Sequence, residues 1–295
     1  MFENRNYKIL LCWVILMNIR TFLSVGITAA LCGYLLLVPQ QRVYAAGSDV
    51  QKFQRECNSG NGESCTKIGV LLLMAENYAR SFPFFERACL LKDADGCHFA
   101  GSLYYDGTGV PKNYTKAADY HLKACSWGNG QSCSDIGNMY YSGLGFQKDL
   151  RKGNEFSRKA CALKYGGGCV DLGISYEQGR GVGKDLRKAR ELASKACSLG
   201  SALGCRNLGA IYYTGRGVRK DPVKALRHFQ KSCSLKGPDG RAEGCAGVAL
   251  IFFQGDGVPK NLTQAWFYSD RSCRFGYQKA CELRDAIKAF WRSAK

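Results

Sequence analysis

The sequence predicts an all-α solenoid in which disulfides join successive helix pairs. Fourteen of the 16 cysteines form seven close pairs, and the pairs from Cys89 to Cys233 recur every 36 residues. Between the pairs, apolar residues recur at three and four positions, as on an amphipathic helix. A fixed period of this size is typical of stacked helix pairs. With 46% hydrophobic and 12% aromatic residues, the 295-residue chain has enough apolar surface to exclude a disordered protein.

The first 46 residues predict export. They contain two apolar runs, and Val43 and Ala45 satisfy the small-residue rule of a signal-peptidase site. The leader has a normal length if translation starts at Met17 rather than Met1. The alternative is an uncleaved signal anchor, because about 20 apolar residues can span a bilayer. In both cases we expect the rest of the chain to be secreted or periplasmic. We expect contact with a membrane only through this segment, and only if it stays uncleaved.

The paired cysteines predict disulfides. Six pairs are eight positions apart and one is twelve apart, and each pair joins the end of one predicted helix to the start of the next. An even number of cysteines in an exported chain favours disulfides. Zinc ligation is disfavoured because zinc sites prefer gaps of two to four residues. The expected pairs are Cys57/Cys65, Cys89/Cys97, Cys125/Cys133, Cys161/Cys169, Cys197/Cys205, Cys233/Cys245 and Cys273/Cys281.

Each repeat predicts two helices, A and B. Helix A follows the second cysteine for about three turns and ends at Gly-x-Gly, where glycine adopts the left-handed conformation. Helix B then begins at an N-cap with a side-chain oxygen, for which we expect Asn113, Asp149, Asp185, Asp221 and Asn261. We expect a capping helix in residues 47–64, six repeats in residues 65–280 and a second capping helix in residues 281–295, with Phe290 and Trp291 facing inward.

A small residue recurs once in every helix. Glycine inside a helix costs about 1 kcal/mol relative to alanine, so close contact between helices A and B must offset it. The positions are Gly69, Gly101, Gly137, Gly173, Gly209 and Ala249 in helix A, and Ala117, Gly153, Ala189, Ala225 and Ala265 in helix B.

The motifs LG..Y..G.GV..D..KA and KAC resemble Sel1-like repeats, a variant of the tetratricopeptide helix pair. With a cysteine pair in each repeat, the chain from about residue 48 onward is similar to the Helicobacter cysteine-rich proteins. The resemblance implies a right-handed α-solenoid whose concave groove binds a protein or peptide partner. It also implies an alternative function, a β-lactamase or penicillin-binding protein with weak hydrolysis of β-lactams, whose ligand would be a β-lactam or a peptidoglycan fragment.

The chain contains no complete catalytic motif. Serine β-lactamases need S-x-x-K together with S-D-N and K-T-G elements. One S-x-x-K occurs, with Ser64 and Lys67 as weak catalytic candidates, but Ser64 occupies the small position that precedes the second cysteine in every repeat. The histidines, His98, His121 and His228, lie at unrelated repeat positions, so we expect surface or hydrogen-bonded histidines rather than ligands. We therefore expect no metal and no cofactor.

For the groove, we expect helix A side chains to contact the partner, namely Tyr105, Asn138, Tyr141, Tyr176, Asn207 and Tyr213. The net charge is +18, and lysines share one turn position and one helix B position in successive repeats. These lysine stripes indicate either a solvated face or an anionic partner. We do not expect nucleic acid outside the cell. The stripes comprise Lys112, Lys148, Lys184, Lys220 and Lys260 in the turn, and Lys116, Lys152, Lys188 and Lys224 in helix B.

Overall fold

A computed structural model describes residues 49–236 and 240–293. The predicted leader, residues 1–46, lies outside the described residues. The helix pairs lie in one compact unit, residues 53–295. Within the described ranges, every regular element is an α-helix, and none of these helices combines the length and apolar character needed to cross a bilayer.

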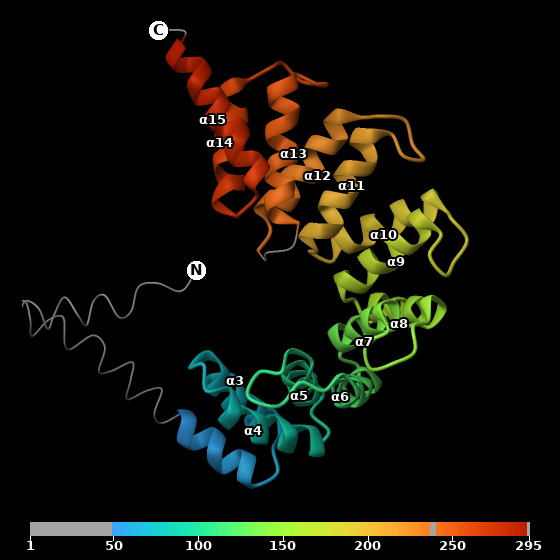
Figure 1. Cartoon of the computed structure of the whole chain (residues 1–295), viewed down its shortest axis with the longest axis vertical. Coiled ribbons are helices and arrows are strands. Elements are labelled where there is room, and N and C mark those ends of the chain that lie inside the picture. The colour runs from blue at the N-terminus through green and yellow to red at the C-terminus, as the bar shows by residue number, and fades with distance from the viewer. Residues whose placement is uncertain (1–48, 237–239, 294–295) are drawn as a thin grey trace, which may run out of the picture. The chain divides into compact units, whose positions relative to one another are not determined.

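The helices follow one another in pairs, as predicted (Figure 1). The first helix of each pair has an odd number: α3 Gly62–Met74, α5 Ala94–Asp106, α7 Gly130–Ser142, α9 Gly166–Gln178, α11 Ala202–Thr214 and α13 Arg241–Gln254. Their partners are α4 Tyr78–Leu90, α6 Tyr114–Ser126, α8 Leu150–Ala162, α10 Leu186–Ser198, α12 Pro222–Ser234 and α14 Leu262–Arg274. Helix α15, Gln278–Ser293, packs on α14 at the end of the array. This arrangement confirms the α-solenoid.

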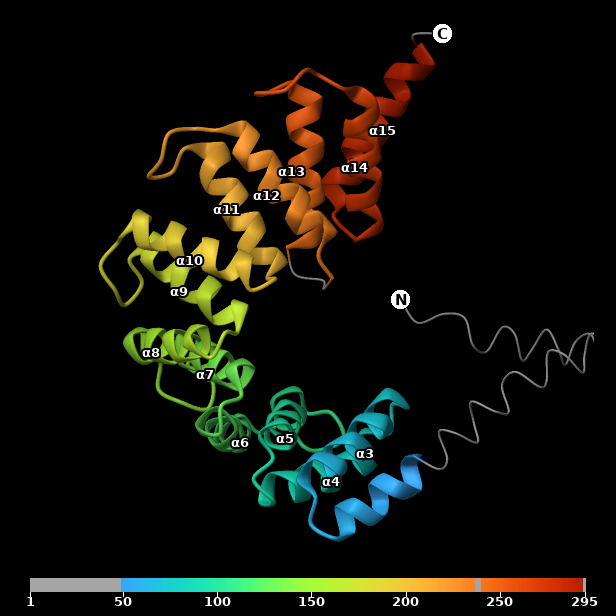
Figure 2. The same ribbon diagram turned by 180° about the vertical axis from the view of Figure 1, so that it is seen from behind.

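The odd-numbered helices line the inner side of the curved array (Figure 2). Each even-numbered helix packs between its own partner and the next odd-numbered helix. In addition, α7 packs on α9, α9 on α11, and α11 on α13. Extensive packing between helices two positions apart is confined, in the described part of the chain, to odd-numbered helices. The inner surface is therefore built from the predicted A helices.

The predicted helix boundaries are confirmed at the even-numbered helices. The carboxylate of Asp149 accepts hydrogen bonds from the backbone N–H groups of Arg151 and Lys152, at 2.9 and 3.0 Å. The other four predicted N-caps make the same kind of bond. At the ends of α5, α7, α9, α11 and α13, a left-handed glycine with φ between 73° and 75° terminates the helix.

The odd-numbered helices begin earlier than predicted. The second cysteine of each pair lies at the start of its helix, as predicted, but the helix begins three or four residues before the cysteine. At α3, α5, α7 and α11 the physical reason is an N-cap, a polar residue four positions before the cysteine. These cysteines are Cys65, Cys97, Cys133, Cys169, Cys205, Cys245 and Cys281.

Two of these helix starts show the effect in detail. Asp93 accepts a hydrogen bond from the backbone N–H of Gly96 at 2.7 Å, so α5 already includes Cys97. Asn61 does the same for the backbone N–H of Ser64 at 2.9 Å and starts α3 before Cys65, the residue at which the first repeat was predicted to begin. The predicted capping segment 47–64 therefore contains a helix over residues 49–58 and the first turn of α3.

The predicted inward position of Phe290 is wrong. Its side chain is 57% exposed, whereas Ile287 is 2% exposed. Trp291 packs against Trp266, with 6.2 Å between ring centroids. The reason is helical geometry: Ala280, Ile287 and Trp291 are seven and four residues apart and share the face that covers the array, and Phe290 lies outside this stripe.

All seven predicted disulfides are present, with Cα–Cα distances of 4.4 to 4.8 Å. Each bond joins two sequential helices of the array. The bonded pairs are Cys57–Cys65, Cys89–Cys97, Cys125–Cys133, Cys161–Cys169, Cys197–Cys205, Cys233–Cys245 and Cys273–Cys281.

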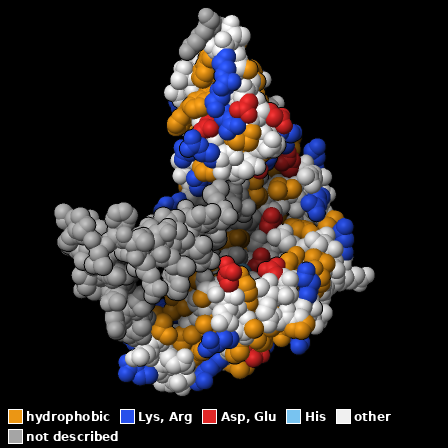
Figure 3. Space-filling view, turned by 60° about the vertical axis from the view of Figure 1, so that its left-hand side comes forward, with side chains coloured by type: hydrophobic (Ala, Val, Ile, Leu, Met, Phe, Trp, Pro, Cys, Tyr) orange, Lys and Arg blue, Asp and Glu red, His pale blue; other side chains and the backbone are white. Residues whose placement is uncertain are grey.

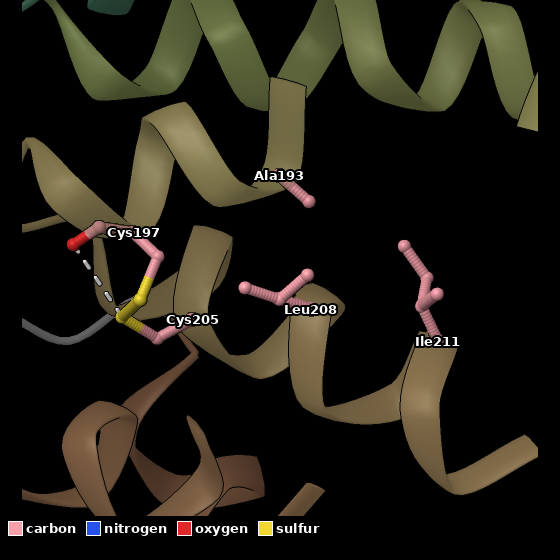
Figure 4. Close-up of a cluster of buried hydrophobic side chains, with 5 residues drawn as sticks. All are labelled: Ala193, Cys197, Cys205, Leu208 and Ile211. Carbon is pink, nitrogen blue, oxygen red and sulfur yellow. Dashed lines mark hydrogen bonds between the residues drawn. A yellow bond between two sulfur atoms is a disulfide. The ribbon is translucent and has the colours of Figure 1, made fainter. Parts of the chain in front are cut away.

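The cysteines belong to the interior of the array. Because the second cysteine lies within a helix that packs on its neighbours, six of the seven have no exposed surface: Cys65, Cys97, Cys133, Cys169, Cys205 and Cys245. Several pairs contribute to small cores at the junctions between repeats. Figure 4 shows one such core, in which Cys197 and Cys205 pack with Ala193, Leu208 and Ile211. These buried cysteines stabilise the fold and are not available to contact a partner.

The recurring small residues allow close contact between the helices of a pair, as predicted. Gly69, Gly101 and Gly209 leave room for large side chains of the partner helix, whereas Gly137 faces another glycine. A Cβ on Gly137 of α7 would lie 3.1 Å from the carbonyl oxygen of Gly153 in α8. Such a contact is tighter than ordinary van der Waals contact, so the absence of a side chain lets the two helices approach. Close helix packing is therefore the gain that offsets the cost of glycine at this position.

Candidate functional site on the inner helices

The structure does not bring the six predicted groove residues together. Tyr105 and Asn138 line one cavity. The hydroxyl groups of Tyr141 and Tyr213 donate hydrogen bonds to Asn154 and Gln254 within the array. Asn207 accepts a hydrogen bond from its neighbour Arg206 at 2.8 Å and lies close to Glu177.

Tyr176 belongs to a set of four tyrosines at equivalent positions of successive repeats. Each of their rings is covered by a lysine of helix B. In four successive repeats a lysine ammonium lies 5.1 to 5.6 Å from a tyrosine ring centroid, the geometry of a cation–π contact. The contacts join Lys116 to Tyr104, Lys152 to Tyr140, Lys188 to Tyr176 and Lys224 to Tyr212. The lysine stripe therefore has a packing role inside each repeat.

The cavity that contains Tyr105 and Asn138 has a volume of about 190 Å³ and lies where α5, α6 and α7 meet. Its polar lining is His98, Ser102, Tyr105, Asp106, His121, Gln131, Asp135 and Asn138. Two of the three histidines of the chain are among these residues. A pocket with converging polar and titratable groups is the expected form of a binding site.

Two imidazoles and a carboxylate converge at this cavity. The Nδ1 atoms of His98 and His121 lie 3.5 and 3.9 Å from Oδ2 of Asp135. The hydroxyl of Ser132 lies 3.0 Å from Nδ1 of His98 and 3.4 Å from Nδ1 of His121. The two rings are 5.5 Å apart between centroids. This grouping, which could hold a metal ion, was not anticipated from the sequence.

Close helix packing positions His121. A Cβ on Gly101 would lie 2.9 Å from Cε1 of His121, so the small position of α5 leaves the room that this imidazole occupies. His98 reaches Asp135 because the two residues are 37 positions apart, one repeat plus one residue. Ser134 and Asp171 have the same separation, and the Ser134 hydroxyl donates to the Asp171 carboxylate at 2.8 Å. A separation of 37 residues was therefore the feature of the sequence from which the contact between His98 and Asp135 could have been predicted.

Burial controls the charges of the cluster. It lowers the pKa of His98, and together with the charge of His98 it lowers the pKa of His121 to about 3. Both imidazoles are therefore neutral at pH 7. Burial, reinforced by Asp171 and Asp106, raises the pKa of Asp135 to about 7. Burial also raises the pKa of Asp171.

The S-x-x-K candidates take separate partners. The buried hydroxyl of Ser64 donates to the Glu56 carboxylate at 2.6 Å. The Lys67 ammonium pairs with Glu63 at 2.7 Å, one helical turn away, and this hydrogen bond raises the pKa of Lys67. A lysine that acts as a general base needs a lowered pKa. Ser64 is therefore hydrogen-bonded to Glu56 rather than to Lys67, and Lys67 stays charged.

A second cavity, of about 600 Å³, lies where α11, α13 and α15 meet. Its lining includes three cations, Arg206, Arg216 and Lys279, beside apolar side chains such as Leu250 and Leu283. The face in Figure 3 has Asp and Glu around its hollow and Lys and Arg mostly on its outer parts. The inner surface is thus acidic near α7 and more basic near α11, although the whole chain carries a net charge of +18.

The family model described as "Sel1 repeat" matches residues 94–129, 130–165, 167–201, 202–236 and 242–274. These ranges coincide with five consecutive helix pairs and cover more than half of the chain. The chain belongs to the Sel1 repeat family. The pair α3–α4 precedes the matched ranges. It nevertheless has a disulfide bond to the helix on each side and packs as the Sel1 repeats do.

Solved structures of Sel1 proteins are similar to this chain. A protective antigen of uropathogenic Escherichia coli strains is 28% identical, with a TM-score of 0.62 over 81% of this chain and 51% of the antigen. The chain thus spans about half the length of that protein. A Sel1 repeat protein from Oxalobacter formigenes is 23% identical, with a TM-score of 0.65 over 76% of this chain and 87% of its own length, and shows the shared fold.

The solved structures that are similar to this chain also include a Helicobacter cysteine-rich protein. Helicobacter pylori cysteine-rich protein B is 36% identical over 46% of this chain and 95% of its own length, with a TM-score of 0.38. A search of curated proteins gave no match.

Proposed function

We propose that this Sel1 repeat protein is an exported scaffold that binds a polypeptide partner along its inner groove. The observation that carries the proposal is a set of exposed or half-buried polar and apolar side chains on three of the odd-numbered helices. Gln131 and Asn138 on α7, Asn207 on α11 and Leu250 on α13 all line cavities of this surface. Repeat arrays use extended concave surfaces of this kind to bind other proteins.

The charge pattern supports an oriented partner. Asp106 and Asp135 lie at the α5–α7 cavity, and Arg206 and Lys279 lie at the α11–α15 cavity. An extended segment with basic residues at one end and acidic residues at the other matches this order. The seven disulfides support a secreted or periplasmic location, because such bonds persist in oxidising compartments.

A capture experiment tests the groove. Oxidised residues 47–295 are immobilised and exposed to cell-envelope and host extracts, in parallel with three variants. We expect Asn138→Ala and Leu250→Asp to lose the captured polypeptide, because both side chains line the groove. Lys152→Ala, on the tyrosine-covering stripe, is the matched control and should retain it. Loss of the partner in the Lys152 variant alone would contradict the groove and favour an anionic ligand of the lysine stripe.

A further inference from the structure

The cluster at the α5–α7 cavity has the ligand set of a transition-metal site. Imidazole nitrogen and carboxylate oxygen are the ligands that zinc takes in sites with three protein ligands. His98, His121 and Asp135 offer two nitrogens and one oxygen, and the three atoms all lie within 4.8 Å of one another. We propose that these three residues bind a divalent transition-metal ion, for which zinc has the best-matched chemistry, with a fourth coordination position open to the cavity.

The nitrogen–oxygen distances are close to those of tetrahedral coordination, and side-chain rotation has to bring the three ligand atoms, now within 4.8 Å of one another, closer together. Zinc bonds of about 2.0–2.1 Å place tetrahedral ligand atoms roughly 3.3 Å apart. The two nitrogen–oxygen distances in the cluster are 3.5 and 3.9 Å. The ligands come from three different helices, so the repeat packing itself holds them in place. Ser132, which lies against both nitrogens, closes the buried side, and the cavity of about 190 Å³ leaves the other side accessible.

The donor atoms favour a transition metal. The ring nitrogen of a neutral imidazole gives its lone pair to a metal, and a carboxylate oxygen completes the set. Two nitrogen ligands also select zinc, copper or nickel over magnesium and calcium, which prefer oxygen. His228 offers an internal comparison: its ring stacks on Tyr212 in another repeat, 5.6 Å between centroids, and lies outside the cluster.

Equilibrium dialysis against ZnCl₂, with metal quantified by mass spectrometry, tests the site. The protein is residues 47–295 without a histidine tag, stripped with EDTA and free of reactive thiols by assay, because reduced cysteines would bind zinc themselves. We expect one zinc per chain. His98→Ala and Asp135→Asn should each weaken binding by more than about 100-fold, since loss of a partner outside the coordination sphere already costs about 10- to 100-fold. His228→Ala should bind as the unmodified protein does.

Cobalt provides a second readout, which reports the coordination geometry of the bound metal rather than its affinity. Co²⁺ in the unmodified protein should show the intense visible absorption of tetrahedral coordination, and Asp135→Asn should lose it while its far-ultraviolet circular dichroism stays unchanged. Absence of zinc from the unmodified protein, undiminished binding in both ligand variants, equal loss in His228→Ala, or a preference for Ca²⁺ over Zn²⁺ would each overturn the site. Because the probe is the metal alone, the result is independent of whether the groove binds a polypeptide.

Discussion

Burial and the neighbouring charges of Asp171 and Asp106 change the titration of Asp135, and solution experiments can follow this change. A carboxyl pKa raised to about 7 means that the folded protein holds this proton more tightly than the unfolded chain does. The stability contributed by Asp135 is therefore fully present below its unfolded pKa, near 4, and is lost as the pH rises to about 7. His98 and His121 act oppositely, because their lowered pKa values make the folded state lose stability as the pH falls below about 6.5.

Replacing Asp135 by Asn separates these contributions. In EDTA, we expect the free energy of unfolding of Asp135→Asn to rise relative to that of the unmodified protein between about pH 4 and pH 7, and then to level off. Both proteins keep the two histidines, so their contribution cancels to first order in the difference. Urea unfolding across this pH range provides the measurement. A difference that does not change with pH would contradict the raised pKa of Asp135.

Ser64 yields a prediction about β-lactams. Its hydroxyl is buried and donates to Glu56, and Lys67 is held as a cation by Glu63. We therefore expect incubation with penicillin to leave Ser64 unacylated, as measured by peptide mass mapping of the oxidised protein. Acylation of Ser64 that Ser132→Ala retains and Ser64→Ala abolishes would instead establish a nucleophile at this position.

For single residues, helix caps and turns could be predicted from the sequence more reliably than contacts between side chains of different helices. Asp149 and the helix-ending glycines were predictable because a cap or a left-handed turn is a local requirement. The convergence of His98 with His121 was not, because it depends on which faces of α5 and α6 meet. Comparing residues at the same position of successive repeats does not reveal the cluster either, because His98 pairs with Asp135, 37 residues further along, whereas the repeat period is 36.

At the scale of one helix, the N-caps are repeated stabilising elements whose contribution can be measured. The Asp149 side chain satisfies two backbone N–H groups at the start of α8. We expect Asp149→Ala to lower the free energy of unfolding by about 1 kcal/mol. Glu155→Ala, on the exposed face of the same helix, removes the same charge without removing a cap and should change stability by less than about 0.5 kcal/mol. Equal losses in the two variants would attribute the effect to charge alone.

The helix starts explain where element prediction fell short. The turns before the odd-numbered helices are rich in Gly and Ser, and their polar residues resemble ordinary turn residues. Only the hydrogen bonds that Asp93 and Asn129 accept from the backbone identify them as N-caps, which place Cys97 and Cys133 inside the helices. At α15 the helical spacing of Ala280, Ile287 and Trp291 decides which face is covered, and Phe290 lies outside it.

At the scale of the whole molecule, stability comes from contacts between sequential neighbours. The hydrophobic clusters are small, and those that contain cysteines lie at the junctions between repeats. In such an array, the stability is approximately a sum of repeat terms and nearest-neighbour terms. The disulfide at each junction therefore acts locally, on the two repeats that it joins.

Removal of a central disulfide tests this locality. The Cys161–Cys169 bond closes a loop of eight residues, so Cys161→Ala combined with Cys169→Ala should lower the free energy of unfolding by about 2.5 kcal/mol through the entropy of the unfolded chain. Hydrogen exchange should accelerate most in α8 and α9, which flank the bond, and least in α3 and α14. The corresponding double variant at Cys273 and Cys281 is the control and should loosen α14 and α15 instead. A uniform acceleration from α3 to α15 in both variants would show that the array unfolds as one cooperative unit, with the disulfides stabilising all repeats together.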